Sequence, residues 1–463
     1  MSRHLTVLCW VTATTLLGCQ RYEPAPLDLS VHRGIWEARD AGGVAVADYA
    51  RRLAEAGGSD GAGTFDPRDG LEVREAEVVA LFFNPQLRAA RAKARIPAVG
   101  AAEAGRWADP ELNVDVERII SSVPDPWVLG GMLGFTIPLS GRLGVEKDLA
   151  LAEADSGKWG VLVEEARVLA ELRGRWLALA VLDRRLELTR AFLGDLDRVV
   201  ANAERLREQG EIDPIEAKLF RIEQVRRRAE ARGLELERRE LELAAKGVMG
   251  LAPGADVKLL PALPRVADRV EASARRRWVE EHHPRLRQAR AEHAVAERAL
   301  ELEVRKQYPD LGLGGGFGTD EGDRRLLGGL SLPLPIFNGN RRAIAEARAA
   351  RDAARAAAEA TYEELVGALA RGEMALDTAR QRREFVEREL APLVDEQLRD
   401  ARNLGRLGAA STVVLLEALT RAHETKVEVL DTVAKEAAAI DQLNELLRGG
   451  PGVAPDAAPG ANP

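Results

Sequence analysis

Residues 326–342, with the sequence LLGGLSLPLPIFNGNRR, join an extended segment to a helical one. Positions 326–334 alternate so that leucines and one glycine lie on one side of the segment, which is typical of a β-strand. Pro333 and Pro335 end this strand, and the sequence predicts a helix over residues 341–404. A strand that leads directly into so long a helix is unusual in a globular domain, so the fold must place a sheet at the end of long helices.

The composition of the 463-residue chain favours long helices over several packed cores. Only 4% of the residues are aromatic, and alanine, leucine, glutamate and arginine are abundant. The formal charge of −8 comes from 74 acidic and 66 basic side chains that are mixed along the same segments. Because no basic face stands out, we expect no nucleic acid among the partners.

The first residues resemble a bacterial lipoprotein signal. A short basic start precedes an apolar run over residues 5–17, which is too short for a permanent membrane anchor. The tetrapeptide Leu-Leu-Gly-Cys that ends at Cys19 resembles a lipobox, which implies a signal peptide over residues 1–18 and lipidation of Cys19. Gln20 at the next position favours the outer membrane, and an ordinary cleaved signal with an incidental cysteine is the alternative. The only other cysteine, Cys9, lies inside the predicted signal peptide and would be removed with it, so no disulfide is expected.

The first half of the chain alternates between helical and extended patterns. Residues 19–70 are rich in glycine and proline and form a tether with one short helix over residues 45–56. The period of the apolar residues then predicts a series of elements. They are a helix over 72–106 interrupted at Asn84-Pro85, strands over 111–117 and 129–137, a helix over 141–207, a turn over 209–214, a helix over 215–249 and a break over 250–264.

The same order of elements returns in the second half. Residues 84–92, NPQLRAARA, correspond to residues 283–291, HPRLRQARA, and DPEL at 109–112 corresponds with the same offset to YPDL at 308–311. An offset kept across a full helix indicates an internal duplication. The second half is predicted to contain strands over 311–317 and 326–334 with a loop over 320–325, the helix over 341–404, a turn over 405–411 and a helix over 412–447. The predicted divisions after the tether are a first repeat over 71–250, a linker over 251–268, a second repeat over 269–448 and a disordered tail over 449–463.

Together the two repeats predict a mixed α and β membrane protein with four transmembrane β-strands in each protomer. The strands have the length that a tilted strand needs to cross a bilayer, with apolar residues facing outward and polar or small residues inward. Four strands cannot close a barrel, and open strand edges are not tolerated in lipid, so several copies must contribute to one barrel. A helix of about 65 residues is about 100 Å long, so the helices must project from the membrane as a second, helical cylinder.

Two other classes of protein remain as alternatives. A lipid-anchored periplasmic coiled-coil spacer would explain the helices but not two hairpins of membrane length. A periplasmic adaptor also carries helical hairpins, but usually one, flanked by soluble β domains, whereas this sequence predicts two.

Residues 70–448 resemble the TolC family of outer-membrane efflux proteins, in its lipoprotein branch. The resemblance rests on the duplicated starts Asn84-Pro85 and His283-Pro284, the prolines before the strands, LPLPIF at residues 332–337, and Gly408-x-x-Ser411. It implies a homotrimer with a twelve-stranded barrel that continues as a periplasmic α-helical, coiled-coil barrel. It further implies that the protein is the exit duct of a tripartite efflux system, with a periplasmic adaptor (membrane fusion) protein, an inner-membrane transporter and outer-membrane lipid as partners.

The resemblance also places a constriction lined by acidic residues at the tips of the helical hairpins. Gly210 and Gly408 mark these tips and the expected adaptor-docking surface. Counting from the glycines, Glu216 and Glu417 take acidic positions, and Asp213 is a third candidate for this gate. Carboxylates repeated by threefold symmetry would favour cations, whereas ordinary solvated acids at a helix start are the alternative.

In the family, two rings of acidic residues line the constriction. Val414 stands where one of these acidic residues is expected, so the sequence does not predict a complete second ring. No Ser, His and Asp set and no pair of carboxylates stands in a catalytic context, so we expect no enzymatic activity. The histidines lack the helical spacing of metal ligands, so neither a metal nor another cofactor is expected.

Overall fold

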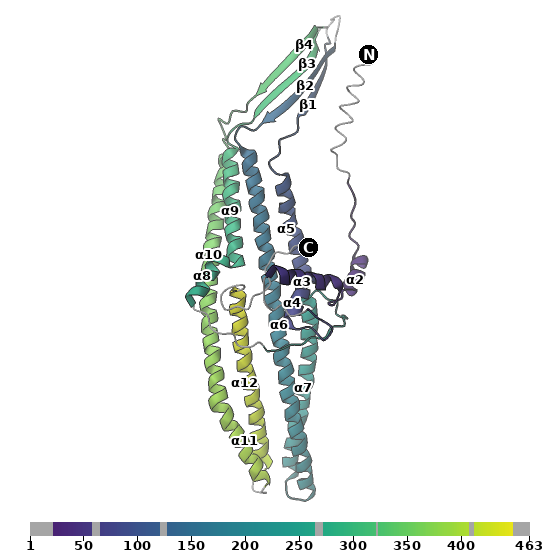
Figure 1. The fold of residues 1–463 in the computed structure, drawn as a ribbon, viewed down its shortest axis with the longest axis vertical. Coiled ribbons are helices and arrows are strands. Elements are labelled where there is room, and N and C mark those ends of the chain that lie inside the picture. The colour runs from purple at the N-terminus through teal and green to yellow at the C-terminus, as the bar shows by residue number, and fades with distance from the viewer. Residues whose placement is uncertain are drawn as a thin grey trace.

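The molecule is a long rod with a β-sheet at one end and paired helices along the rest of its length (Figure 1). The computed structural model describes residues 22–57, 65–120, 127–263, 272–320, 323–406 and 412–447. The predicted signal peptide with Cys19, the tip residue Gly408 and the predicted tail over residues 449–463 lie outside these residues. Within the described parts of the chain, no helix is both long enough and apolar enough to span a bilayer.

Both halves of the chain contain two helices, a β-hairpin and a helical hairpin, in that order. The first half consists of α2 (Leu29–Glu37), α3 (Val44–Gly57), α4 (Val73–Phe83), α5 (Pro85–Glu103), β1 (Glu111–Arg118), β2 (Trp127–Ile137), α6 (Arg142–Glu208) and α7 (Pro214–Val248). The second consists of α8 (Ala272–His282), α9 (Pro284–Arg305), β3 (Leu311–Asp320), β4 (Asp323–Ser331), α10 (Arg341–Phe385), η2 (Val386–Leu390), α11 (Ala391–Arg406) and α12 (Thr412–Leu446). The repeated order agrees with the predicted duplication. The helices α2 and α8 were not predicted as separate elements, nor was the π-helical turn that divides the helix predicted over residues 341–404.

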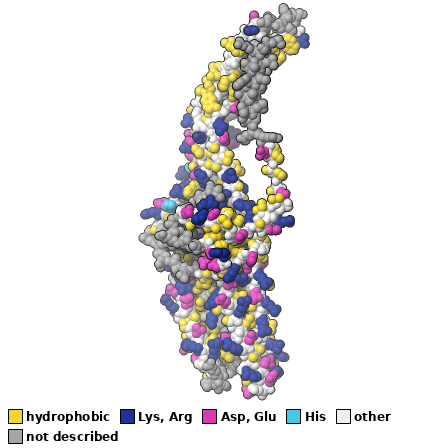
Figure 2. Space-filling model, turned by 45° about the vertical axis from the view of Figure 1, so that its right-hand side comes forward, with side chains coloured by type: hydrophobic (Ala, Val, Ile, Leu, Met, Phe, Trp, Pro, Cys, Tyr) yellow, Lys and Arg dark blue, Asp and Glu magenta, His cyan; other side chains and the backbone are white. Residues whose placement is uncertain are grey.

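The four strands form one antiparallel sheet in the order β1-β2-β3-β4, so the two hairpins are joined through β2 and β3. The pairing places every second residue of each strand on one face, and on that face nearly all side chains are apolar. The apolar members are Leu112, Val114, Val116, Leu129, Leu133, Phe135, Ile137, Leu311, Leu313, Phe317, Leu326 and Leu330. Phe317 is 75% exposed and Leu326 is 78% exposed in the single protomer. Figure 2 shows hydrophobic side chains gathered over the strands and mixed charges over the helices.

The last strand differs from its predicted bounds at both ends. The loop predicted over residues 320–325 is shorter, because β4 begins at Asp323 and pairs with β3 from Asp320 onward. The strand predicted to continue to residue 334 ends at Ser331. Pro333 has no N–H to donate to a neighbouring strand, which accounts for this early end.

The helix predicted without interruption over residues 341–404 contains a turn of π-helix at Val386–Leu390, between α10 and α11. The prediction overlooked Pro392, which lies just after this turn. Proline lacks the N–H for the i−4 hydrogen bond, and its ring collides with the carbonyl of residue i−4, here Arg388. A wider helical turn in front of the proline relieves both conflicts.

The hydrophobic interior follows α6, which packs against α4, α5, α7, α9 and α12. At mid-height Leu172 and Trp176 of α6 lie in one buried cluster with Val79 of α4 and Met249 after α7. Leu71 and Leu259, which belong to the same cluster, also form a parallel β-bridge between the segment before α4 and the segment after α7. Tertiary packing at mid-height therefore fixes the long helices relative to one another, which helix propensity cannot do.

Candidate functional site

The two helical hairpins, α6 with α7 and α11 with α12, point to the end of the rod opposite the sheet (Figure 1). In the first hairpin Gly210 follows α6 with φ +77, a conformation that favours glycine. The backbone N–H of Glu211 donates to the carbonyl of Leu206 at 2.9 Å and closes the turn. No atom lies within 4 Å of the position that a Cβ at Gly210 would take, so the tip surface is open there.

Asp213 has a structural role at this tip. Its carboxylate accepts a hydrogen bond from the backbone N–H of Ile215 at 2.6 Å and caps the start of α7. Pro214 follows at the first helical position, which is a typical helix start. Glu216 lies in the same first turn and is partly exposed. Two negative charges therefore meet the positive end of the α7 dipole.

Glu417 lies in the second hairpin, five residues after the start of α12 at Thr412. Its carboxylate accepts a hydrogen bond from Arg421 one turn further along the helix at 2.6 Å. Both side chains are more than half exposed, so this pair is weak. In the single protomer the charge of Glu417 is thus partly compensated, which the sequence pattern did not indicate.

The two hairpins are joined to each other above the tips. The ring of Phe192 on α6 stacks on His423 of α12 with centroids 4.6 Å apart. Arg402 of α11 donates to Asp195 of α6 at 3.2 Å. Burial, together with the nearby charge of Arg227, lowers the pKa of His423 and so favours the neutral imidazole between the helices.

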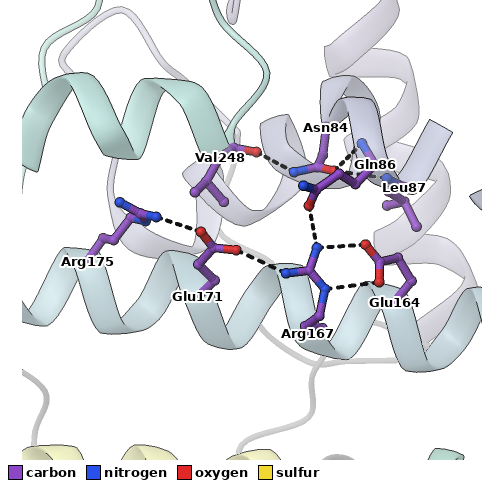
Figure 3. Close-up of polar contacts among 8 residues, drawn as sticks. All are labelled: Asn84, Gln86, Leu87, Glu164, Arg167, Glu171, Arg175 and Val248. Atoms are coloured by element: carbon purple, nitrogen blue, oxygen red, sulfur yellow. Dashed lines mark hydrogen bonds and ion pairs between the residues drawn. The ribbon is translucent and has the colours of Figure 1, made fainter. Parts of the chain in front are cut away.

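At mid-height the Asn84-Pro85 motif has a structural explanation (Figure 3). The Asn84 side chain caps α5 by accepting hydrogen bonds from the backbone N–H groups of Gln86 and Leu87, both at 2.9 Å. Its amide donates to the carbonyl of Val248 at 2.7 Å, and Asn84 is 4% exposed. One buried side chain thereby ties the start of α5 to the end of α7.

Arg167 of α6 adds a polar network beside this cap (Figure 3). It donates to Gln86 of α5 and to both carboxylate oxygens of Glu164, at 3.0 and 2.7 Å, and it also contacts Glu171. The hydrogen bond from Arg167 lowers the pKa of Glu164. The network holds α5 against α6 at the height where the first hairpin begins.

His283 takes the position of Asn84 in the second half of the chain. Its Nδ1 accepts a hydrogen bond from the backbone N–H of Arg285 at 3.2 Å and so caps α9. His283 is 7% exposed. Burial, with a smaller contribution from the charge of Arg285, lowers its pKa to about 4. Only the unprotonated nitrogen can accept the capping hydrogen bond.

The cap at His283 makes stability depend on pH. Between its usual pKa near 6.5 and the folded value of about 4, the unfolded chain binds a proton that the folded chain does not bind. We expect the free energy of unfolding to fall as the pH drops through this window, by on the order of 3 kcal/mol. His283→Asn keeps a capping side chain that does not titrate, so its unfolding should be less sensitive to pH in chemical denaturation. An identical pH dependence of the two proteins would contradict this role.

The face of the sheet opposite the apolar one carries carboxylates and glycines. Glu111, Asp115 and Glu117 of β1 lie on this face. The neighbouring positions of β2 and β3 are largely glycine, for example Gly130 and Gly318 beside Asp115. This face therefore has negative charge and little side-chain bulk.

The described residues contain no group of three His, Cys, Asp or Glu side chains that could hold a metal ion. A groove of about 240 Å³ lies between α6 and α12 and is lined mainly by alanines, Leu169, Leu177 and Gly174. Asp441 and Glu445 border it, and burial raises the pKa of both carboxyls. No serine, threonine, cysteine, histidine or lysine lies on the lining of this groove.

Comparisons with known proteins give one family match and several similar folds. Residues 278–447 match the sequence model of a family described as outer membrane efflux protein. No curated protein matches the chain by sequence at a significant level.

Three solved structures have a similar fold. A membrane protein from Pseudomonas aeruginosa is 21% identical, with 82% of this chain and 90% of that chain covered and a TM-score of 0.68. The outer membrane protein VceC from Vibrio cholerae is 17% identical, with 82% and 96% covered and a TM-score of 0.70. The MtrE outer membrane channel of Neisseria gonorrhoeae, in its open state, is 16% identical, with 85% and 91% covered and a TM-score of 0.66. All three share the fold over most of their length.

Proposed function

We propose that this protein is the outer-membrane exit channel of a tripartite efflux system. Residues 278–447 match the outer membrane efflux protein family, and 82% and 85% of the chain share the fold of the outer membrane protein VceC and of the MtrE outer membrane channel. Three copies form a barrel in the outer membrane, and the helices extend into the periplasm. The matching family is one of channels, which agrees with the prediction that the chain is not an enzyme. Lipidation at Cys19, predicted from the sequence, anchors the tether to the same membrane.

The observation that carries this proposal is the sheet with one apolar and one polar face. Its four strands have two open edges, β1 and β4, and an apolar face exposed in the single protomer. Exposing that apolar face to water is unfavourable, and in lipid the unpaired backbone N–H and C=O groups of the two open edges would lack hydrogen-bond partners. Both requirements are met when β4 of one copy pairs with β1 of the next in a closed barrel.

An exposed seam on α7 supports the association of several copies along the helices. Ile215, Ile222, Leu236 and Leu243 lie at multiples of seven residues, with Ala229 at the intervening position, and are 71%, 58%, 66% and 50% exposed. The opposite side of α7, with the buried Phe220, packs against α6. A second apolar stripe at heptad spacing is suited to a helix of a neighbouring protomer.

The proposal is tested by isolating the lipidated protein and measuring its assembly and conductance. We expect heat-modifiable trimers in the outer-membrane fraction and discrete channels in planar bilayers. A lipid-anchored coiled-coil spacer would be retained by its lipid but would conduct no ions. A monomer without conductance would refute the channel. If the protein does form conducting trimers, cross-linking from a cysteine placed at Gly210 or Gly408 would identify the adaptor and the transporter.

For the tips we propose that Glu216 and Glu417, with Asp213 at the helix start, form a cation-selective constriction in the trimer. Glu417→Ala is expected to lower the ratio of cation to anion permeability by about twofold to tenfold, because one carboxylate per protomer is lost. Arg421→Ala provides the opposite change, because it removes the cation that compensates Glu417. Reversal potentials in a salt gradient measure both. Unchanged values in both variants would place Glu417 outside the constriction.

A further inference from the structure

At the end of the sheet farthest from the helices, all carboxylates of the described strands lie on one face. Asp115, Glu117 and Asp323 lie on the polar face. Arg118 and Arg324 lie on the apolar face, since they share the register of the leucines and valines on β1 and β4. The apolar face therefore carries only basic charges at this end, whereas the polar face carries the carboxylates together with one arginine, Arg325.

The two arginines and one tryptophan form a polar border to the apolar face. Trp127 is the direct cross-strand partner of Arg118, whose guanidinium lies over the indole ring, 5.4 Å from its centroid. Trp127 is 49% exposed, so the ring is both a platform for the arginine and part of the surface. Arg324 pairs with Thr319 on β3, and Thr319 pairs with Leu129 on β2. Among the described residues, neither arginine has an ion pair or a hydrogen bond from its side chain.

The position of this border along the strands is that of a membrane interface. Phe317 and Leu326 pair with each other in the adjacent apolar row, two residues closer to the helices than Thr319 and Arg324. Two residues of a strand span about 6.6 Å, so the charges begin directly where the apolar belt ends. Tryptophan is enriched at the interface between hydrocarbon and headgroups, and arginine there can remain charged beside lipid phosphates.

We propose that Arg118, Arg324 and Trp127 form a collar that binds the phosphate of an anionic lipid headgroup at the outer rim of the barrel. This inference rests on the proposed function, since it requires the apolar face to lie in lipid. Guanidinium groups bind phosphate through paired N–H donors, and no carboxylate lies in the described register of this face to compete for them. When β4 pairs with β1 of the next copy, Arg324 of one protomer comes beside the neighbour's β1, so the collar continues around the barrel.

Arg325 provides a matched control for this collar. It is the next residue to Arg324, carries the same charge and pairs with Gly318 on the opposite, polar face. A general effect of positive charge near the membrane would be lost equally on replacing either arginine. A contact with lipid would be lost only for the side chain on the apolar face.

The experiment measures lipid preference in reconstituted vesicles of phosphatidylcholine. Spin-labelled phosphatidic acid and spin-labelled phosphatidylcholine are compared by the ratio of their association constants at the protein surface. We expect a clear preference of the wild-type trimer for phosphatidic acid, lowered by up to about fivefold in R118Q or R324Q and brought close to one in the double variant. R325Q should keep the wild-type ratio. The R118K/R324K variant should retain part of the preference, because the charge stays while paired donation is lost.

The outcomes separate the collar from the channel itself. Conductance is recorded for the same preparations, so a wild-type trimer that conducts but has no lipid preference refutes the collar alone, and a wild-type protein without conductance refutes the channel. An unchanged preference in the double variant, or an equal loss in R325Q, overturns the inference. If the wild-type trimer shows no preference for phosphatidic acid but binds inorganic phosphate, and the double variant loses that binding, the arginines bind free phosphate and the lipid assignment is wrong. If the double variant does not form trimers, the two single variants decide, since each is expected to lower the ratio.

Discussion

Gly316→Ala is expected to abolish formation of the membrane sheet and of the trimers that depend on it. A Cβ built on Gly316 would lie 2.0 Å from the backbone oxygen of Gly131 and 2.8 Å from the Cα of Met132. These are backbone atoms of the paired strand β2, so the conflict cannot be relieved by a side-chain rotation. The pairing of β2 with β3 is the link between the two hairpins, and its loss should cost on the order of 4 kcal/mol or more. Heat-modifiable trimers in the outer-membrane fraction should disappear.

The neighbouring glycine is the control for this prediction. Gly315 lies on the other face of β3, and no atom is within 4 Å of the position of its Cβ. Gly315→Ala adds the same methyl group to the same strand and should leave trimers at the wild-type level. Equal trimer yields for the two variants would mean that β2 and β3 are not paired in the register described.

Glu436→Ala is expected to destabilise the second helical hairpin by about 3–5 kcal/mol. Glu436 of α12 is 2% exposed, and its two oxygens accept hydrogen bonds from Arg380 at 2.9 Å and from Arg383 at 2.5 Å, both on α10. Truncation leaves two poorly exposed guanidinium groups without this acceptor. Arg380 and Arg383 lie just before the π-helical turn at Val386–Leu390, where regular helical hydrogen bonding is already interrupted. Chemical unfolding followed by circular dichroism at the helical band measures the loss.

Glu428 offers a comparison on the same two helices. It accepts a hydrogen bond from Arg382 at 2.5 Å, but the two side chains are 37% and 56% exposed. Surface pairs contribute little, so Glu428→Ala should cost less than about 1 kcal/mol. Similar losses for the two variants would show that burial does not decide the strength of the Glu436 contacts.

The prediction of the fold from sequence succeeded where a regular period extends over many residues. The alternation in residues 111–117 and 129–137 and the heptad-like spacing in residues 141–207 depend only on which side chains share a face. Predictions failed where one residue interrupts a long pattern. Pro392 changes a single turn of a helix that is otherwise continuous in its apolar spacing, and α2 is too short to show a period.

For the candidate site, the sequence located the turn of the first hairpin but could not assign the contacts of each side chain. The turn at Gly210 and the helix start at Asp213 are local features and were readable. That Glu417 pairs with Arg421 depends on side-chain conformations, of which the sequence allows several. The stacking of His423 on Phe192 joins residues on different hairpins, and no local pattern signals it.

The sequence by itself determined the types of most elements, their order, the duplication and the apolar face of the sheet, because these properties follow from the chemistry of neighbouring residues along the chain. Only the tertiary structure decided that β2 pairs with β3, that Glu436 meets two arginines of α10, and that Arg118 and Arg324 lie on one face at one height. These contacts join residues far apart in sequence, and their geometry depends on where packed elements meet. Local conformational preferences do not specify which residues of two distant elements come into contact, so packing and strand register decide these contacts.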